Sequence, residues 1–208
     1  MSQPSQRQPW VVAITGASGT VYARTLVRQL LTHVADLSLD IVISEAGMRV
    51  LREEEGLKCS QNAPDPQSLF GTKSDRLRFH HFQDIGAGIA SGSYPAAGMI
   101  VVPCSMSSLA AIASGVSSNL IHRAAEVTLK EGRPLIVVPR ETPLSAIQLE
   151  NMLKLARLGV RVVPAMPGFY HQPQQIEELV DMLVMRIADQ MGFQLPLARR
   201  WKSDEAEL

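Results

Sequence analysis

The chain has 208 residues, of which 46% are hydrophobic and 19% are charged, and its 20 basic and 20 acidic residues leave no net charge. That length suits one substantial α/β domain and is short for two. Because there is no global basic field, we expect binding neither to nucleic acid nor to an anionic membrane surface. Any charge chemistry must therefore be local.

The placement of cysteines and histidines argues against a disulfide framework or a metal site. Cys59 and Cys104 lie far apart, and the five histidines show no ligand spacing such as HxxxH, so we expect no metal. The first ten residues lack the apolar core of a signal peptide, and no apolar run approaches ~18 residues. We therefore expect a soluble cytoplasmic protein without a membrane span and with a disordered tail over 1–8.

Short runs rich in valine and isoleucine predict buried parallel strands. None of them alternates polar with apolar residues, as expected when helices cover both faces of a sheet. The predicted strands are Trp10–Ile14, Leu39–Ile43, Met99–Pro103, Leu135–Pro139 and Val160–Pro164.

Helical periodicity fills most of the segments between these runs. Strand alternating with helix predicts an α/β fold with a doubly wound parallel sheet, whose ligands lie beyond the carboxyl ends of the strands. The segment 56–82 is less regular, and we expect a surface excursion there. Pro173 suits the first turn of the last helix. The predicted helices span about 19–33, 45–55, 105–114, 118–131, 144–158 and 174–191.

Small and hydroxyl-bearing residues follow two of the predicted strands. Gly16-Ala17-Ser18-Gly19 leads from a strand into a helix, where an anion could approach backbone N–H groups at the positive end of the helix. A tight strand-to-helix turn uses glycine in any case, so both readings stay open. Ser105-Met106-Ser107-Ser108 follows another strand, where the serines could cap the helix or hold a phosphate.

Basic residues are the candidates for neutralising a phosphorylated ligand. Arg123 and Lys130 are seven residues apart and lie on nearly the same helical face, which could also be a solvated edge. Arg140 and Glu141 leave a buried strand directly, where charges more often meet a ligand or an internal partner. Arg186 is placed on the margin of the apolar stripe of the last helix, as an anion ligand or a snorkelling side chain.

Several long motifs occur in an order that resembles the UbiX-type flavin prenyltransferases. The most specific segments are RAAEVTLKE followed by RPL and VPRETP, and PGFYHQPQ. The resemblance extends from about Trp10 to Trp201 and is weakest over 56–82. The other matching segments are TGASG, IASGSYP, VVPCSMSSLAAIASG and NMLKLARLG.

The resemblance implies a single-domain Rossmann-like fold over 9–195 and a C-terminal tail over 196–208. It implies a metal-independent transferase that joins the dimethylallyl group of dimethylallyl monophosphate to N5 and C6 of reduced FMN. The prenylated FMN would serve UbiD-type decarboxylases, one of them in ubiquinone biosynthesis. The family assembles into dodecamers whose active sites are shared between subunits.

The same resemblance assigns residues of this chain to the site. Those expected to contact FMN are Gly16, Ala17, Ser18, Ser44, Ser105, Met106, Ser107, Ser108 and Arg140. Those expected to bind the dimethylallyl phosphate, some from different subunits, are Ser91, Arg123, Lys130, Tyr170 and Arg186.

Catalytic roles follow from the resemblance as well. Glu54 with Ser18 is associated with proton movement at flavin N5, and Glu141 is expected between flavin and phosphate. The π-faces of Tyr170 and Trp201 could stabilise an allyl cation, with Trp201 brought over the prenyl site by the C-terminal tail.

Two other functions keep the same fold. A flavin-dependent cysteine decarboxylase would carry a catalytic histidine and a PxMN motif, and neither is found. A non-catalytic FMN carrier would keep the Gly16–Ser18 turn without needing the charged groups and Tyr170 together. Their joint presence favours the enzyme.

Overall fold

The computed structural model describes residues 7–57, 60 and 62–201. Residues 1–6 of the expected N-terminal tail, Cys59 and residues 202–208 of the expected C-terminal tail lie outside the described residues. The strands are β1 Trp10–Ile14, β2 Leu39–Ile43, β3 Leu77–His80, β4 Gly98–Cys104, β5 Leu135–Pro139 and β6 Arg161–Val162. The helices are α1 Thr20–His33, α2 Glu45–Glu55, α3 Pro66–Phe70, α4 Met106–Ser114, α5 Leu120–Lys130, α6 Ala146–Arg157 and α7 Ile176–Met191, with a 3₁₀ turn at Gly88–Ala90.

The strands form one parallel sheet in the order β3-β2-β1-β4-β5-β6. In β1, Trp10 pairs with Leu39 of β2 on one side and with Gly98 of β4 on the other. The chain order reverses between β1 and β4, which is where doubly wound folds bind their ligands. The expected fold class is confirmed.

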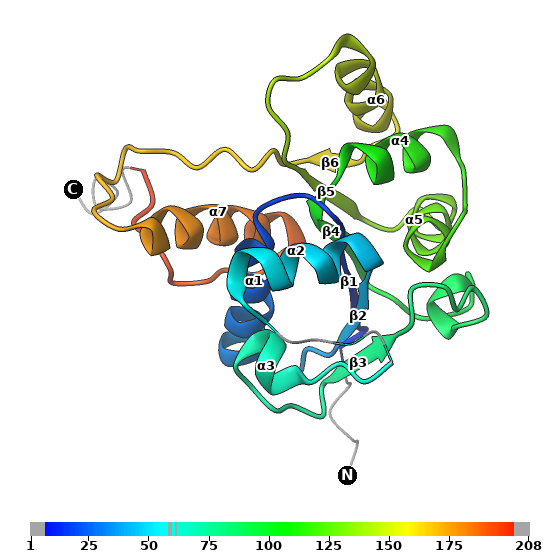
Figure 1. Cartoon of the computed structure of the whole chain (residues 1–208), viewed down its shortest axis with the longest axis horizontal. Helices are drawn as coiled ribbons and strands as arrows, with labels where there is room; N and C mark the ends of the chain where they lie inside the picture. The colour runs from blue at the N-terminus through cyan, green and yellow to red at the C-terminus, as the bar shows by residue number, and fades with distance from the viewer. Residues whose placement is uncertain (1–6, 58–59, 61, 202–208) are drawn as a thin grey trace.

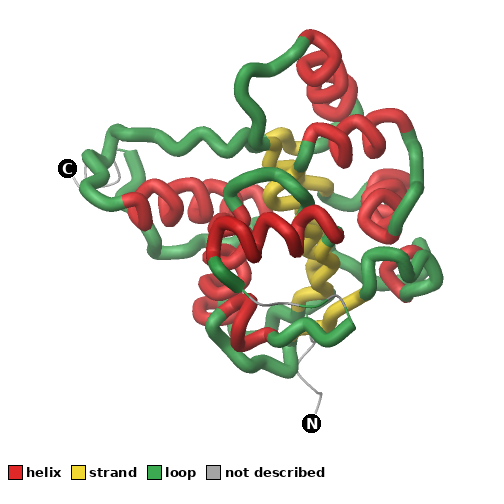
Figure 2. Tube along the Cα trace, in the orientation of Figure 1, coloured by secondary structure: helices red, strands yellow, loops and turns green. Residues whose placement is uncertain are grey.

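Helices cover both faces of the sheet, so both faces of its central strands are buried (Figure 2). Val12 and Ile14 of β1 pack under α1 and α7, whereas Val11 and Ala13 of the same strand face α4 and α5. This arrangement explains why the strand sequences are continuously apolar instead of alternating.

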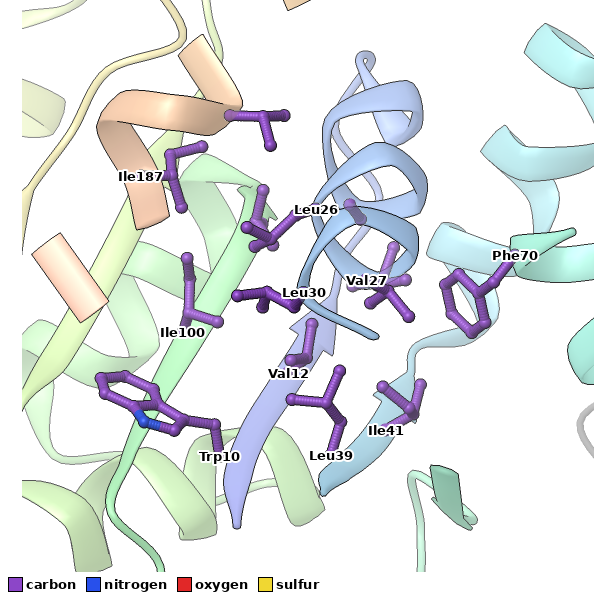
Figure 3. Close-up of a cluster of buried hydrophobic side chains, with 14 of the residues drawn as sticks. Trp10, Val12, Leu26, Val27, Leu30, Leu39, Ile41, Phe70, Ile100 and Ile187 are labelled. Carbon is purple, nitrogen blue, oxygen red and sulfur yellow. The ribbon is translucent and has the colours of Figure 1, made fainter. Parts of the chain in front are cut away.

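The larger apolar cluster joins α1 to the sheet and to α7. Leu26 and Leu30 of α1 lie against Val12 and Ile100, and Ile187 of α7 closes the same cluster (Figure 3). Burying one such side chain contributes about 1.5–3 kcal/mol. These contacts fix α1 on the sheet and therefore fix the turn from which it starts.

The expected surface excursion over 56–82 is wrong in part. This segment contains α3, whose Leu69 and Phe70 are buried, and β3, which pairs with β2 as the edge strand. The short run of β3 carries Arg78 and His80, which turn toward an acid on β2. Because Arg78 and His80 interrupt its apolar residues, the sequence of β3 does not read as a buried strand.

Other boundaries shift less. The last helix begins at Ile176 with Gln175 as its N-cap, so Pro173 precedes the first turn instead of lying in it. The predicted strand Val160–Pro164 is reduced to Arg161–Val162. No helix within the described ranges is both long and apolar enough to cross a bilayer.

Gly47 lets α2 approach the carboxyl end of β1. A Cβ atom built on Gly47 would lie 2.7 Å from the carbonyl oxygen of Ile14, which is backbone and cannot rotate away. The glycine is therefore a packing requirement at the edge where β1 ends. The close approach also sets the distance from α2 to the turn that follows β1.

We predict that Gly47→Ala lowers the free energy of unfolding by about 1–3 kcal/mol, because the added methyl must push α2 off β1. Urea unfolding measures the change. The control, Glu53→Ala on the exposed side of α2, should change stability by less than about 0.5 kcal/mol. Equal stabilities for the parent and Gly47→Ala would contradict the close packing of α2.

Candidate active site

The carboxyl ends of β1 and β4 are joined through the side chain of Thr15. Its hydroxyl donates to the carbonyl of Pro103 at 2.8 Å and accepts from the N–H of Ser105 at 2.7 Å. Thr15 is only 1% exposed, so these bonds are shielded from water. They hold the turn after β1 beside the start of α4, and the two predicted hydroxyl-rich segments are therefore neighbours.

The N-terminus of α1 is occupied by a carboxylate from α2. Glu54 Oε2 accepts hydrogen bonds from the N–H of Gly19 at 3.0 Å and of Thr20 at 3.4 Å. Burial opposes ionisation of Glu54, but its hydrogen bonds with Ser18, Gly19 and Thr20 outweigh this and lower its pKa. The sequence suggested a ligand anion at this helix end, and the structure places the protein's own anion there, next to Ser18.

Arg140 connects the end of β5 to the turn after β1. Its Nε donates to the carbonyl of Ser18 at 3.2 Å. This bond brings the guanidinium to the switch point of the sheet, the place between β1 and β4 where the strand order reverses. The neighbouring Glu141 is exposed and accepts from the N–H of Thr142 at 3.0 Å. Of the predicted pair, Arg140 is therefore anchored at the turn after β1, whereas Glu141 remains accessible to solvent.

The serines at the other strand ends act as helix caps. Ser44 accepts from the N–H of Gly47 at 3.0 Å, and Ser105 accepts from the N–H of Ser108 at 3.3 Å. The Ser105 hydroxyl also lies 3.1 Å from that of Ser107. The predicted capping role is thus confirmed for Ser105, and the structure adds a cap at Ser44. A role in binding FMN stays a prediction for both serines and for Ser107 and Ser108.

A second group of predicted residues gathers around the loop before β4. Arg123 Nε donates to the carbonyl of Ala90 at 3.3 Å, next to Ser91. A Cβ built on Gly92 would lie 2.2 Å from Glu131 Oε1 and 2.8 Å from Lys130 Nζ, so the Lys130–Glu131 ion pair lies against the backbone of the same loop. The structure therefore brings Ser91, Arg123 and Lys130 together, although they are up to 39 positions apart in the sequence.

A third group forms around α7 and the C-terminal segment. The rings of Tyr170 and Trp201 meet edge to face with centroids 5.4 Å apart, and both are well exposed. Arg186 donates to Asp189 Oδ2 at 2.7 Å. Asp189 also receives two hydrogen bonds from Arg200, at 2.7 and 2.9 Å. The Arg200 contacts hold the C-terminal segment on α7, and they depend on a long-range approach that the sequence pattern does not reveal.

The second and third groups lie on opposite faces of the sheet. α5, which carries Arg123 and Lys130, packs on the face covered by α4. α7, which carries Arg186, packs with α1 on the other face. Figure 1 shows α7 and the chain end on one side of the molecule and α5 on the other. Within one copy, the predicted phosphate-binding residues therefore do not form a single cluster.

The groups at the switch point suit a flavin mononucleotide chemically. None of the hydrogen bonds within the described residues uses the backbone N–H of Ala17 or Ser18, so both donors remain available to an anion. Arg140 adds a guanidinium beside them.

The thiol of Cys104 is buried, and burial raises its pKa to about 12, so it stays protonated at neutral pH. The described part of the chain holds no cluster of three or more metal-ligating side chains.

We predict that Glu54→Gln lowers the free energy of unfolding at neutral pH by about 0.5–1 kcal/mol, because it removes the charge that caps α1. The folded-state pKa of Glu54 is lowered, so this stabilisation is complete above the ordinary glutamate pKa of about 4.3. It disappears as the pH falls through the lowered pKa.

Urea unfolding of the parent and the variant between about pH 7 and about pH 2, a range that extends below the lowered pKa of Glu54, measures this difference. Glu53→Gln, on an exposed neighbour that does not cap α1, is the control. A difference between the parent and Glu54→Gln that does not shrink in acid would contradict the electrostatic cap.

Known proteins resemble this chain over almost its whole length. The flavoprotein family model matches residues 1–188. Flavin prenyltransferase UbiX of Synechocystis sp. is 46% identical over 201 residues, which cover 94% of this chain and 96% of that protein. Flavin prenyltransferase UbiX of Halalkalibacterium halodurans is 45% identical over 192 residues, which cover 92% of each protein.

Solved structures agree with these relatives. A dodecameric FMN-dependent UbiX-like decarboxylase from Escherichia coli O157:H7 superposes with a TM-score of 0.83 at 41% identity, over 93% of this chain and 99% of that one. AnUbiX (PadA1) in complex with FMN and dimethylallyl pyrophosphate gives a TM-score of 0.83 at 37% identity, over 94% and 97% of the two chains. PPC decarboxylase, at 17% identity and a TM-score of 0.57, shares the fold alone. The chain therefore belongs to the flavoprotein family and, within it, to the UbiX flavin prenyltransferases.

Proposed function

We propose that this chain transfers the dimethylallyl group of dimethylallyl monophosphate to N5 and C6 of reduced FMN, giving prenylated FMN. The observation that carries the proposal is its likeness, over nearly the full length of both chains, to a UbiX bound to FMN and dimethylallyl pyrophosphate. As the sequence predicts, we expect the cytoplasm as the compartment and a UbiD-type decarboxylase as the recipient of the product.

FMN is placed at the switch point between β1 and β4. The turn at Gly16, Ala17 and Ser18 supplies backbone N–H groups, and Arg140 supplies a positive charge next to it. The remaining proposed contacts come from residues that begin the neighbouring helices or lie in their first turn: Ser44, Ser105, Met106, Ser107 and Ser108.

The prenyl phosphate is proposed to lie between basic groups from both sheet faces. Ser91, Arg123 and Lys130 would bind the phosphate from one copy, and Tyr170 and Arg186 would reach it from another. The separation of α5 from α7 supports a site shared between copies. The E. coli UbiX-like protein is dodecameric. We propose the same assembly for this chain.

The proposed chemistry breaks the allylic C–O bond and forms a C–N bond at N5, with loss of the N5 proton. That proton adds to the remaining C=C bond of the prenyl group, which then forms a C–C bond to C6 as C6 loses its own proton. Reduced FMN supplies both nucleophilic positions. Arg123, Lys130 and Arg186 stabilise the leaving phosphate dianion by charge-assisted hydrogen bonds. Tyr170 and Trp201 offer ring faces to the allyl cation.

Proton handling is assigned to two carboxylates. Glu54 lies beside Ser18 at the turn, where the pair can move a proton at flavin N5. Glu141, or the released phosphate, can accept the proton lost from C6. The exposed position of Glu141 leaves its carboxylate free to approach both flavin and phosphate.

The direct test is anaerobic incubation of the protein with reduced FMN and either dimethylallyl monophosphate or the pyrophosphate, without added metal. Mass spectrometry of the extracted flavin should show FMN heavier by one prenyl unit with the monophosphate. A protein that binds FMN but returns it unmodified with both donors would instead favour an FMN carrier. Decarboxylation of an added aromatic acid by this protein alone would favour a decarboxylase.

We predict that Glu141→Gln and Tyr170→Phe each retain FMN binding yet slow prenyl transfer by about 10²-fold. Glu141→Gln removes the proposed proton acceptor, and Tyr170→Phe keeps the ring but removes the hydroxyl proposed to reach the phosphate. Single-turnover formation of prenylated FMN measures the rate, and flavin fluorescence measures binding. The control is Arg157→Gln, which removes an exposed charge from α6 and no residue proposed to bind FMN or the prenyl phosphate. Parent-like rates in both site variants would contradict these catalytic assignments.

A further inference from the structure

Asp40 is an acid in the middle of an apolar strand. It belongs to β2, its side chain is 0% exposed, and its neighbours along the strand are Leu39 and Ile41. A buried carboxylate is strongly disfavoured unless it is paired and hydrogen-bonded. The residue has no place in the proposed chemistry, so its presence calls for a separate explanation.

Three side chains satisfy the two oxygens of Asp40. Arg78 donates to both of them, at 3.0 and 3.1 Å, and His80 lies 2.8 Å from Oδ1. Tyr94 donates its hydroxyl to Oδ2 at 2.7 Å. Burial opposes ionisation of Asp40, but the hydrogen bonds from His80, Arg78 and Tyr94 outweigh it and keep the pKa of Asp40 low.

These partners come from two different parts of the fold. Arg78 and His80 lie on the edge strand β3, and their bonds to Asp40 join β3 to the neighbouring strand β2. Tyr94 lies on the loop that leads from the 3₁₀ turn at Gly88–Ala90 to β4. One buried carboxylate therefore ties this loop to the sheet.

The loop held by Tyr94 is the one that carries Ser91. The N–H of Tyr94 donates to the carbonyl of Ser91 at 3.2 Å, and the N–H of Ser91 donates to the carbonyl of Gly88 at 3.0 Å. The Ser91 hydroxyl lies 2.9 Å from that of Ser93. A shift of Tyr94 would thus be transmitted to Ser91 within one turn of backbone.

The other side of the loop meets basic side chains. Arg123 donates to the carbonyl of Ala90, and Arg133 Nη2 donates to the carbonyl of Gly92 at 2.7 Å. The Lys130–Glu131 ion pair lies against Gly92, where a Cβ would be 2.2 Å from Glu131 Oε1 and 2.8 Å from Lys130 Nζ. Asp40 fixes the loop from the sheet side, and the arginines fix it from the α5 side.

We propose that Asp40 is a positioning residue that acts through Tyr94 to hold Ser91 in register with Arg123 and Lys130, so that these three groups meet one phosphate. This role rests on the proposed function. It adds to that function an anchor for the loop that carries Ser91 and Tyr94. The anchor holds the loop from the sheet side, opposite the side that faces Arg123 and Lys130. Asp40 itself touches no substrate, since its oxygens are fully buried and paired.

A purely structural role for Asp40 would be to fasten β3 to the sheet. His80 and Tyr94 separate the two roles, because both donate to Asp40 but only Tyr94 belongs to the loop. His80→Phe and Tyr94→Phe each keep a ring and remove one donor. They therefore form a matched pair that differs in which segment is released.

Tyr94→Phe is expected to raise KM for dimethylallyl monophosphate by about tenfold, the effect of one hydrogen bond to a charged group, with kcat and FMN affinity unchanged. Hydrogen–deuterium exchange should become faster at the amides of residues 91–94. His80→Phe should lower the melting temperature and leave KM and this exchange unchanged. An unchanged KM in Tyr94→Phe, or equal KM effects in both variants, would overturn the positioning role.

Binding of inorganic phosphate, measured by calorimetry, separates this inference from the proposed function. If the parent makes no prenylated FMN, the proposed function fails, while weaker phosphate binding and faster loop exchange in Tyr94→Phe would still support the anchor. If Tyr94→Phe binds phosphate and exchanges as the parent does, the anchor is wrong whatever the parent catalyses.

Discussion

The hydroxyl of Thr15 joins the two strands between which the chain order of the sheet reverses. It bonds the carbonyl of Pro103 and the N–H of Ser105 at once, so the turn after β1 and the start of α4 cannot separate. Arg140 reaches the same turn from β5, and Glu54 reaches it from α2. Thr15 thus holds together two of the segments from which the proposed flavin contacts come.

The sheet that brings the proposed FMN contacts together also separates the residues proposed to bind the prenyl phosphate. Its two faces carry α5 and α7, and each helix bears part of the charge that a phosphate needs. Ser91, Arg123 and Lys130 are positioned by contacts within one face, and Tyr170 and Trp201 by contacts along the other. In one copy, the described contacts leave these groups on opposite faces of the sheet. We propose that a second copy brings them together.

Much of this could be predicted from the sequence, and the exceptions have physical causes. β1, β2, β4 and β5 were predictable because strands covered on both faces are continuously apolar, and the polar strand ends located the site. β3 was not, because Arg78 and His80 interrupt its apolar pattern and pair with Asp40 on the neighbouring strand, a contact that the sequence pattern does not reveal. The pairing of Asp189 with Arg200 likewise depends on tertiary contacts that no local spacing encodes. The roles of the site residues follow from the family motifs and stay predictions.

Subunit complementation tests the central claim, a prenyl site completed by two copies. Arg123→Ala and Arg186→Ala would each be purified and assayed alone for prenylated FMN, then co-expressed with different tags and assayed as a mixed assembly. Because one copy supplies Arg123 and another supplies Arg186, random mixing should restore activity at about one quarter of the sites. Mixed assemblies no more active than the separate variants would contradict the account, because both arginines would then have to come from the same copy.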